Sequence, residues 1–265
     1  MAATPVRGPL DPSPGDREVA LAARWQRLRD GVPSALYLLG CALALLVVLV
    51  ALGWLLAKVV NDDGIGRADA AVSRWMASSR NGDLNDLTAI TTELGGTLPI
   101  TILAVLTVAL TAWMWRRWRE PMLVAVAVTG EVGIFLMVTL LVDRERPPVR
   151  HLDAAPPTSS FPSGHTAAAI ALYGAIAVLA NERARSALVR GLFVAAAVVI
   201  PLVVAASRLY RGMHYLTDVL GGVLLGTVWL YAAVHGIRLG VAHWQLRHAD
   251  RVGDWQHRGS AVRHG

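Results

Sequence analysis

The sequence is poor in charge and in residues that could cross-link the chain. Only 17% of its 265 residues are charged, whereas 54% are hydrophobic, and the mean hydropathy is +0.47. This balance argues against an ordinary soluble domain and favours an integral membrane protein. The single cysteine, Cys41, excludes an intramolecular disulfide. The single lysine, Lys58, leaves nearly all of the positive charge to arginine.

The arginines give the chain a net charge of +6 and a pI of about 10.2. In a soluble protein such an excess would point to nucleic acid. Here the arginines fall between apolar runs, which indicates contact with anionic lipid head groups and signals that set membrane topology. We therefore expect membrane lipids as partners and no nucleic acid, and the sequence predicts no particular oligomeric state.

Six apolar runs punctuate the chain. A helix of about 20 residues crosses the roughly 30 Å hydrocarbon core of a bilayer. The sequence therefore predicts an all-α fold, an integral membrane bundle of six transmembrane helices. The six runs cover residues 33–60, 98–115, 121–142, 165–180, 192–207 and 214–234.

The runs divide the chain into a membrane domain, 32–237, and two polar tails, 1–31 and 238–265. The first tail is too long and too polar to open a cleavable signal peptide. Within the membrane domain, residues 61–96 are polar. We predict that they form an extracytoplasmic loop with an interfacial helix near Asp69–Ser79.

Six spans place both termini on one side of the membrane, and the arginines indicate which side. One face carries arginines after each pair of spans, whereas the other carries Arg67, Arg74 and Arg80 in a long loop and the arginines of the polar stretch that holds the motifs. The positive-inside rule assigns the first face to the cytoplasm. We expect a multi-pass cell-membrane protein whose two tails are cytoplasmic and whose polar stretch, Arg144 to Asp218, faces outward. The arginines of the cytoplasmic face are Arg24, Arg27, Arg29, Arg116, Arg117, Arg119, Arg183, Arg185, Arg190, Arg238 and Arg247.

His214 and Asp218 lie four residues apart at the start of the last span, so they share one helix face. A carboxylate near an imidazole fixes its tautomer and raises its basicity, which suits a histidine nucleophile. The same pair could equally be half of a metal site.

The sequence Pro162-Ser163-Gly164-His165 opens the fourth span. Glycine allows a ligand to approach the backbone, and the free N–H groups of a first helical turn bind anions. Ser163 could donate a hydroxyl or cap the helix. His165 could act chemically or simply be satisfied at a helix end.

Three arginines border the same predicted membrane face: Arg144 and Arg146 after the third span, and Arg208 near the end of the fifth. Planar guanidinium groups match phosphate oxygens, although arginines at a span end can also merely reach toward the interface. Converging cations would repel a divalent metal, which argues against the metal reading of His214 and Asp218.

Together these residues resemble the three-part signature of the type 2 phosphatidic acid phosphatase superfamily of lipid phosphate and polyprenyl-pyrophosphate phosphatases. Pro-Ser-Gly-His at 162–165 matches the second motif, and Ser-Arg, five residues, His, three residues, Asp at 207–218 matches the third. The first motif is a lysine, six residues, then Arg-Pro. Arg146-Pro147 match it, but Thr139 stands at the lysine position.

The resemblance implies a mechanism without metal or other cofactor. His214 would attack phosphorus and form a phosphohistidine, Asp218 would orient His214, and His165 would protonate the leaving oxygen. The resemblance also implies a set of residues that hold the phosphoryl group: Arg146, Ser163, Gly164 and Arg208. Arg144 is the expected substitute for the missing lysine.

We therefore expect an integral membrane phosphatase acting on a lipid phosphate or pyrophosphate, with polyprenyl pyrophosphate as the first candidate substrate. Phosphatidic acid and phosphatidylglycerol phosphate are the alternatives. Thr139 leaves open a protein that binds or moves lipid phosphates without hydrolysing them. Glu131, in the middle of the third span, is either a functional group or a structural glutamate between helices.

Overall fold

The computed structural model describes residues 34–59 and 64–261. The predicted cytoplasmic tail 1–31 lies outside these residues, as do the last four residues of the predicted C-terminal tail. By its contacts the chain divides into two compact units. One is Leu38–Arg238, which contains all of the motif residues. The other combines the chain ends, Met1–Tyr37 and Leu239–Gly265, and its described part is the beginning of the first helix and the end of the last.

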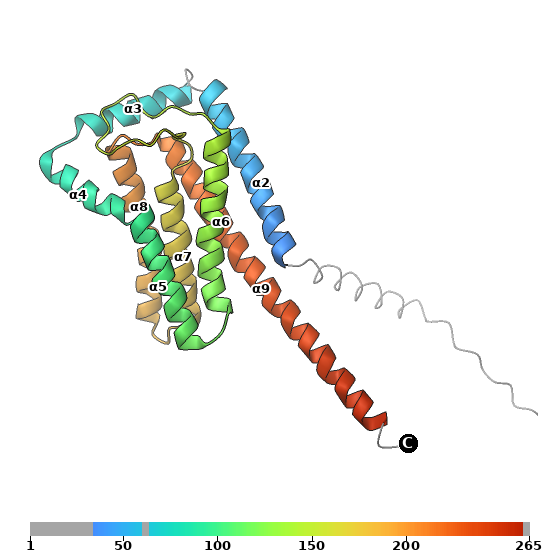
Figure 1. Cartoon of the computed structure of the whole chain (residues 1–265). Helices are drawn as coiled ribbons and strands as arrows, with labels where there is room; N and C mark the ends of the chain where they lie inside the picture. The colour runs from blue at the N-terminus through green and yellow to red at the C-terminus, as the bar shows by residue number, and fades with distance from the viewer. Residues whose placement is uncertain (1–33, 60–63, 262–265) are drawn as a thin grey trace, which may run out of the picture. The chain divides into compact units, whose positions relative to one another are not determined.

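The described residues form helices and no strands, which confirms the all-α prediction (Figure 1). The helices are α2 (Ser34–Trp54), continued by the π-helical turn η1 (Leu55–Val59), α3 (Gly64–Ser78), α4 (Gly82–Glu93), α5 (Thr97–Trp115), α6 (Arg119–Leu141), α7 (Gly164–Arg183), α8 (Ala187–Tyr210) and α9 (Leu216–Ala261).

Six helical segments are long and apolar enough to cross a membrane, so the predicted number of spans is confirmed. Their outer faces carry many exposed leucine and valine side chains, as expected for helices that face lipid. The segments are Ser34–Lys58, Gly82–Trp115, Arg119–Leu141, Gly164–Arg183, Ala187–Tyr210 and Leu216–Val241.

The polar region 61–96 contains two helices where the sequence predicted one. α3 corresponds to the predicted interfacial helix. α4 follows it, begins at the cap residue Asn81, whose side chain accepts a hydrogen bond from the Leu84 amide, and packs against α8. The hydroxyl groups of Thr88 and Thr91 donate hydrogen bonds to backbone carbonyls of α4 itself. This satisfies polar groups in a segment whose sequence is typical of a loop.

α7 lies at the centre of the unit and packs against α5, α6 and α8. α9 also approaches it closely through two glycines. A Cβ atom on Gly222 would lie 2.4 Å from the Ser163 carbonyl oxygen, and one on Gly226 would lie 2.8 Å from that of Ala167. Small residues four apart let helix backbones meet, which holds the start of α7 against α9.

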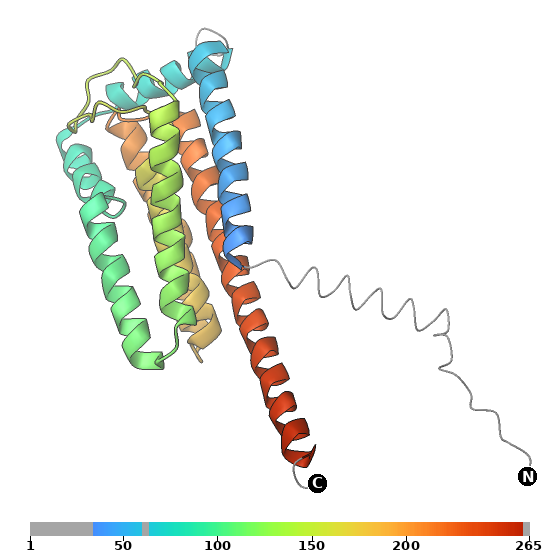
Figure 2. The same cartoon turned by 45° about the vertical axis from the view of Figure 1, so that its right-hand side comes forward.

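One end of the bundle gathers most of the polar segments. The end of α6, the loop 142–163, the start of α7, the end of α8 and the start of α9 all lie there, beneath α3 (Figures 1 and 2). The motif residues are therefore brought together by the fold, although they are far apart in the sequence.

Candidate active site

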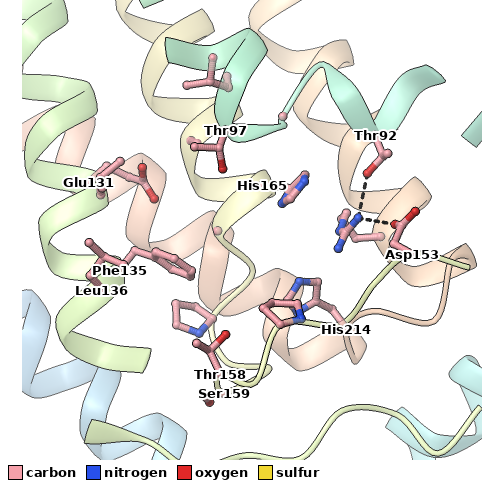
Figure 3. A pocket seen from close by; sticks show the side chains of 18 of the residues that line it. Thr92, Thr97, Glu131, Phe135, Leu136, Asp153, Thr158, Ser159, His165 and His214 are labelled. Atoms are coloured by element: carbon pink, nitrogen blue, oxygen red, sulfur yellow. Dashed lines mark hydrogen bonds and ion pairs between the residues drawn. The ribbon is translucent and has the colours of Figure 1, made fainter. Parts of the chain in front are cut away.

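A cavity of about 650 Å³ opens at this end of the bundle and contains most of the predicted site residues (Figure 3). His165, His214, Arg146, Arg208 and Gly164 line it. Three other predicted residues, Asp218, Ser163 and Arg144, do not. The rest of the wall comes from α5, α6 and α7, from the end of α4 and from the loop 142–163, and its area is largely apolar.

His214 precedes α9 and is almost fully buried. Its Nδ1 donates a hydrogen bond to the Ser160 carbonyl oxygen at 2.7 Å. Because a carbonyl only accepts, Nδ1 carries the proton and Nε2 keeps a free lone pair. Burial lowers the pKa of His214 below its ordinary value, although the charge of Asp218 opposes the shift. The lowered pKa keeps the imidazole neutral, and the hydrogen bond from Nδ1 leaves Nε2 as its free nitrogen. This is the form that a nucleophile needs.

Asp218 does not bond His214 directly, since its Oδ2 lies 3.8 Å from Nδ1. This oxygen accepts a hydrogen bond from the Tyr215 amide at 2.9 Å, and Oδ1 accepts one from Arg144. The Asp218 carbonyl also accepts a bond from the Ser163 amide at 2.9 Å. Asp218 therefore ties the start of α9 to the start of α7, and it acts on His214 through charge and position.

Arg144 is buried beside Asp218, outside the cavity. Its Nη1 bonds Asp218 and the Thr217 hydroxyl (2.7 Å), and its Nη2 bonds Asp69 at 2.9 Å. Its guanidinium group lies 4.6 Å from the centre of the Tyr215 ring. With both terminal nitrogens engaged by carboxylates, Arg144 is not placed to take over phosphate contacts from a missing lysine.

Asp69 completes this buried network from α3. Its side chain is 2% exposed and also accepts hydrogen bonds from the Thr217 amide (3.1 Å) and the Thr217 hydroxyl. Sequence reasoning did not single it out. The only signal was an aspartate within an interfacial helix, a place where solvated carboxylates are common.

Arg146 and Arg208 are the arginines that reach the cavity. Arg146 donates from Nη1 to the Met213 carbonyl at 2.7 Å. Arg208 donates from Nη1 to the Thr92 hydroxyl at 3.0 Å and to Asp153 at 2.8 Å. The Nε atoms of both arginines are buried, and neither has a hydrogen-bond partner among the described residues. The cavity thus offers two cations with unused donors.

Asp153, from the loop before the second motif, holds the arginines of the third. It accepts hydrogen bonds from Nε and Nη2 of Arg211 at 2.6–2.9 Å in addition to that from Arg208. Burial opposes its ionisation, but the bonds from Arg211 and the charge of Arg208 keep the pKa of Asp153 below its ordinary value. Its negative charge orients Arg208 in the empty cavity.

The second motif contributes its backbone and His165. Ser163 is fully buried, and its hydroxyl contacts that of Thr166 at 3.0 Å, away from the cavity. It occupies the N-cap position of α7 without a side-chain capping bond. A Cβ on Gly164 would lie 2.8 Å from Phe135, so this glycine also permits close packing of α7 on α6. The first turn of α7 faces the cavity through Gly164 and His165.

Thr139, at the lysine position of the first motif, bonds the Leu136 carbonyl of its own helix and does not line the cavity. Lys58 does not line it either. Within the described residues, no group of three or more histidine, cysteine or acidic side chains is arranged to hold a metal ion.

Comparison with known proteins places these residues in a family context. Residues 120–239 match the family described as the PAP2 superfamily. Phosphatidylglycerophosphatase B of Bacillus subtilis (strain 168) is 29% identical over 194 residues, which cover 69% of this chain and 89% of the relative.

Two solved structures resemble the fold. The transmembrane PAP2 type phosphatidylglycerolphosphate phosphatase from Bacillus subtilis superposes with a TM-score of 0.64 at 26% identity, covering 71% of this chain and 93% of that one. Aquifex aeolicus LpxE superposes with a TM-score of 0.51 at 16% identity, covering 68% and 99% respectively, which supports the fold alone.

Proposed function

We propose that this chain, which belongs to the PAP2 superfamily, removes the terminal phosphate of a membrane lipid by way of a phosphohistidine on His214. The chain is a membrane lipid phosphatase of this superfamily. The proposal concerns the residues that act and the lipid on which they act.

One observation carries the proposal: two arginines with unused buried donors face the same cavity as two histidines. Buried N–H donors without partners call for an acceptor, and a phosphoryl group brings several. A phosphate held by Arg146 and Arg208 would lie beside the free Nε2 of His214. Catalysis of phosphoryl transfer is mostly positioning and charge stabilisation, which this arrangement supplies.

In the proposed first step, the Nε2 lone pair of His214 forms a bond to phosphorus while the bond from phosphorus to the lipid oxygen breaks. His165 gives a proton to that oxygen, so the lipid alcohol leaves neutral. In the second step, water gives a proton to His165 and attacks phosphorus. The P–N bond breaks, inorganic phosphate is released, and both histidines return to their starting forms.

The wall of the cavity suggests how a lipid enters. Val132 and Leu136 line the cavity, and 39% and 48% of their surfaces are exposed. An apolar wall that reaches the outer surface lets acyl chains remain in the bilayer while the head group enters between α5 and α6.

Contacts at the opposite end of the bundle support an outward-facing site. Arg119 and Arg238 both bond Glu182, at 2.9 and 3.2 Å, so the arginine-rich segments that follow α5 and α7 meet α9 there. By the positive-inside rule we assign this end to the cytoplasm and the cavity to the outer interface.

Phosphatidylglycerol phosphate is our first candidate substrate, because the names of both Bacillus subtilis proteins refer to it. The polyprenyl pyrophosphate predicted from sequence is the competing candidate. Both keep an apolar tail in the membrane and present a terminal phosphate, so the tail alone does not distinguish them.

The test is phosphate release by the purified full chain in detergent, with EDTA present. Phosphatidylglycerol phosphate, phosphatidic acid and a polyprenyl pyrophosphate are compared for the wild type and His214→Ala. Release that survives EDTA and disappears in His214→Ala supports the proposal. Activity that requires added metal, or that persists in His214→Ala, contradicts it.

A further inference from the structure

Glu131 is the buried acid that the proposed chemistry leaves unused. It lies on α6, is 1% exposed and lines the cavity. Neither of its carboxyl oxygens has a hydrogen-bond partner among the described residues. Glu120, on the same helix and equally buried, differs because Arg183 bonds one of its two oxygens and because it does not line the cavity.

An unpartnered carboxyl at this depth is costly. Buried polar groups are nearly always hydrogen-bonded, so one that faces a cavity without a partner indicates a ligand. The surrounding wall is apolar, formed by side chains such as Ile100, Val128 and Leu136. Two threonines, Thr97 and Thr101, also line the cavity, and Thr97 is seen in Figure 3.

The position of Glu131 indicates which part of the ligand it would meet. In Figure 3, Asp153 and Thr92, the partners of Arg208, lie on one side of the two histidines, and Glu131 and Phe135 lie on the other. With the phosphate held by Arg208 beside His214, we place the rest of the molecule on the second side, where the wall is mostly apolar. That side therefore receives the alcohol that departs when the phosphate is removed.

We propose that Glu131 determines specificity by hydrogen bonding a free hydroxyl on the leaving alcohol of the lipid substrate. The inference rests on the proposed function and narrows it to lipid phosphates whose leaving alcohol carries a hydroxyl near the ester. A hydroxyl both donates and accepts, so it can satisfy a carboxyl inside an apolar wall.

The same chemistry selects against the other candidate lipids. The leaving group of a pyrophosphate carries a second phosphate, whose ionised oxygens accept hydrogen bonds but donate none, so it meets only part of the hydrogen-bonding capacity of the carboxyl group. The leaving group of phosphatidic acid has only ester oxygens beside the reacting carbon. The head group of phosphatidylglycerol phosphate has a glycerol hydroxyl next to the phosphate ester and satisfies Glu131.

The test compares phosphatidylglycerol phosphate with phosphatidic acid of the same acyl chains, in wild type, Glu131→Leu and Glu131→Gln. For Glu131→Leu we expect kcat/KM to fall about tenfold or more on the hydroxylated lipid and less than about threefold on phosphatidic acid. Glu131→Gln should keep part of the preference, because an amide also donates and accepts.

The matched control is Glu120→Gln, the same change on the same helix away from the cavity. We expect it to lower stability and to leave the ratio between the two lipids unchanged. An equal loss on both lipids in Glu131→Leu, or no loss on either, would overturn the inference.

A binding assay separates this inference from the proposed function. The affinity of each lipid is measured in His214→Ala, with and without Glu131→Leu. A preference for the hydroxylated lipid that depends on Glu131 supports the inference even if the wild type releases no phosphate. Release by the wild type with a Glu131-independent binding ratio would leave the proposed function intact and refute the role of Glu131.

Discussion

The Asp69 carboxylate on α3 lies 2.9 Å from Nη2 of Arg144, and both side chains are at least 95% buried. Arg144 in turn bonds Asp218. The helix α3 is thereby connected through one arginine to the carboxylate that positions the proposed nucleophile.

Replacing Asp69 should impair catalysis more than substrate binding. Asp69→Asn removes the charge opposite Arg144, so Arg144 and Asp218 lose their fixed geometry while the cavity wall remains. We expect kcat to fall about tenfold or more with KM changed less than about threefold, and Asp69→Glu to restore part of the rate. The matched control is Asp83→Asn, an exposed aspartate in the first turn of α4. A rise in KM alone would contradict this role for Asp69.

A lysine should not replace Arg208. Arg208 uses Nη1 for both Thr92 and Asp153 and keeps Nε free, and lysine has only one nitrogen, so it cannot make these two bonds and also offer a second donor to the phosphate. We expect Arg208→Lys to lower kcat/KM about a hundredfold. Steady-state phosphate release measures the effect, with Arg238→Lys at the opposite end of the bundle as control. Near-wild-type activity in Arg208→Lys would show that charge alone suffices.

The acid limb of the pH profile should lie below the ordinary histidine pKa. Burial lowers the pKa of His214, so the neutral nucleophile persists as pH falls and is lost only below about pH 6.5. The measurement is kcat/KM against pH, corrected for the ionisation of the lipid phosphate, which is titrated separately. A limb that begins above about pH 6.5 would mean that the charge of Asp218 outweighs burial.

The orientation of the helix bundle in the membrane can be determined by labelling two serine-to-cysteine variants of a chain that lacks Cys41. Ser79, at the end of α3, and Ser186, just before α8, are both exposed and lie at opposite ends of the bundle. In intact cells, a membrane-impermeant thiol reagent should label Ser79→Cys and should label Ser186→Cys only after permeabilisation. The reverse pattern would place the cavity in the cytoplasm.

The six spans and the motif residues could be predicted because their signals are local. Long apolar runs identify membrane helices. The motif residues between Arg146 and His214 are recognised by their spacing in the sequence, and the fold brings most of them to one cavity. The helix α4, which packs against α8, was not predicted because its sequence is as polar as that of a loop. In the fold, Thr88 and Thr91 satisfy their hydroxyl groups by donating hydrogen bonds to carbonyls of the same helix.

The partners of Arg144 could not be predicted, because they depend on where α3 settles. In the sequence, Arg144 and Arg146 lie two residues apart, and both were expected to bind the phosphate. In the fold, Arg146 turns into the cavity and Arg144 turns toward Asp69 and Asp218. Glu131 was ambiguous for the same reason, since a mid-span glutamate can face a neighbouring helix or a cavity.

The hydrogen bond from His214 to the Ser160 carbonyl has an evolutionary consequence. Its acceptor belongs to the main chain, so no exchange of the Ser160 side chain can delete it. Substitution of the residue that accepts this bond therefore leaves the acceptor atom in place, whereas substitution of an aspartate partner would remove it. As far as this bond is concerned, position 160 can vary through neutral drift, provided that the path of the backbone is kept.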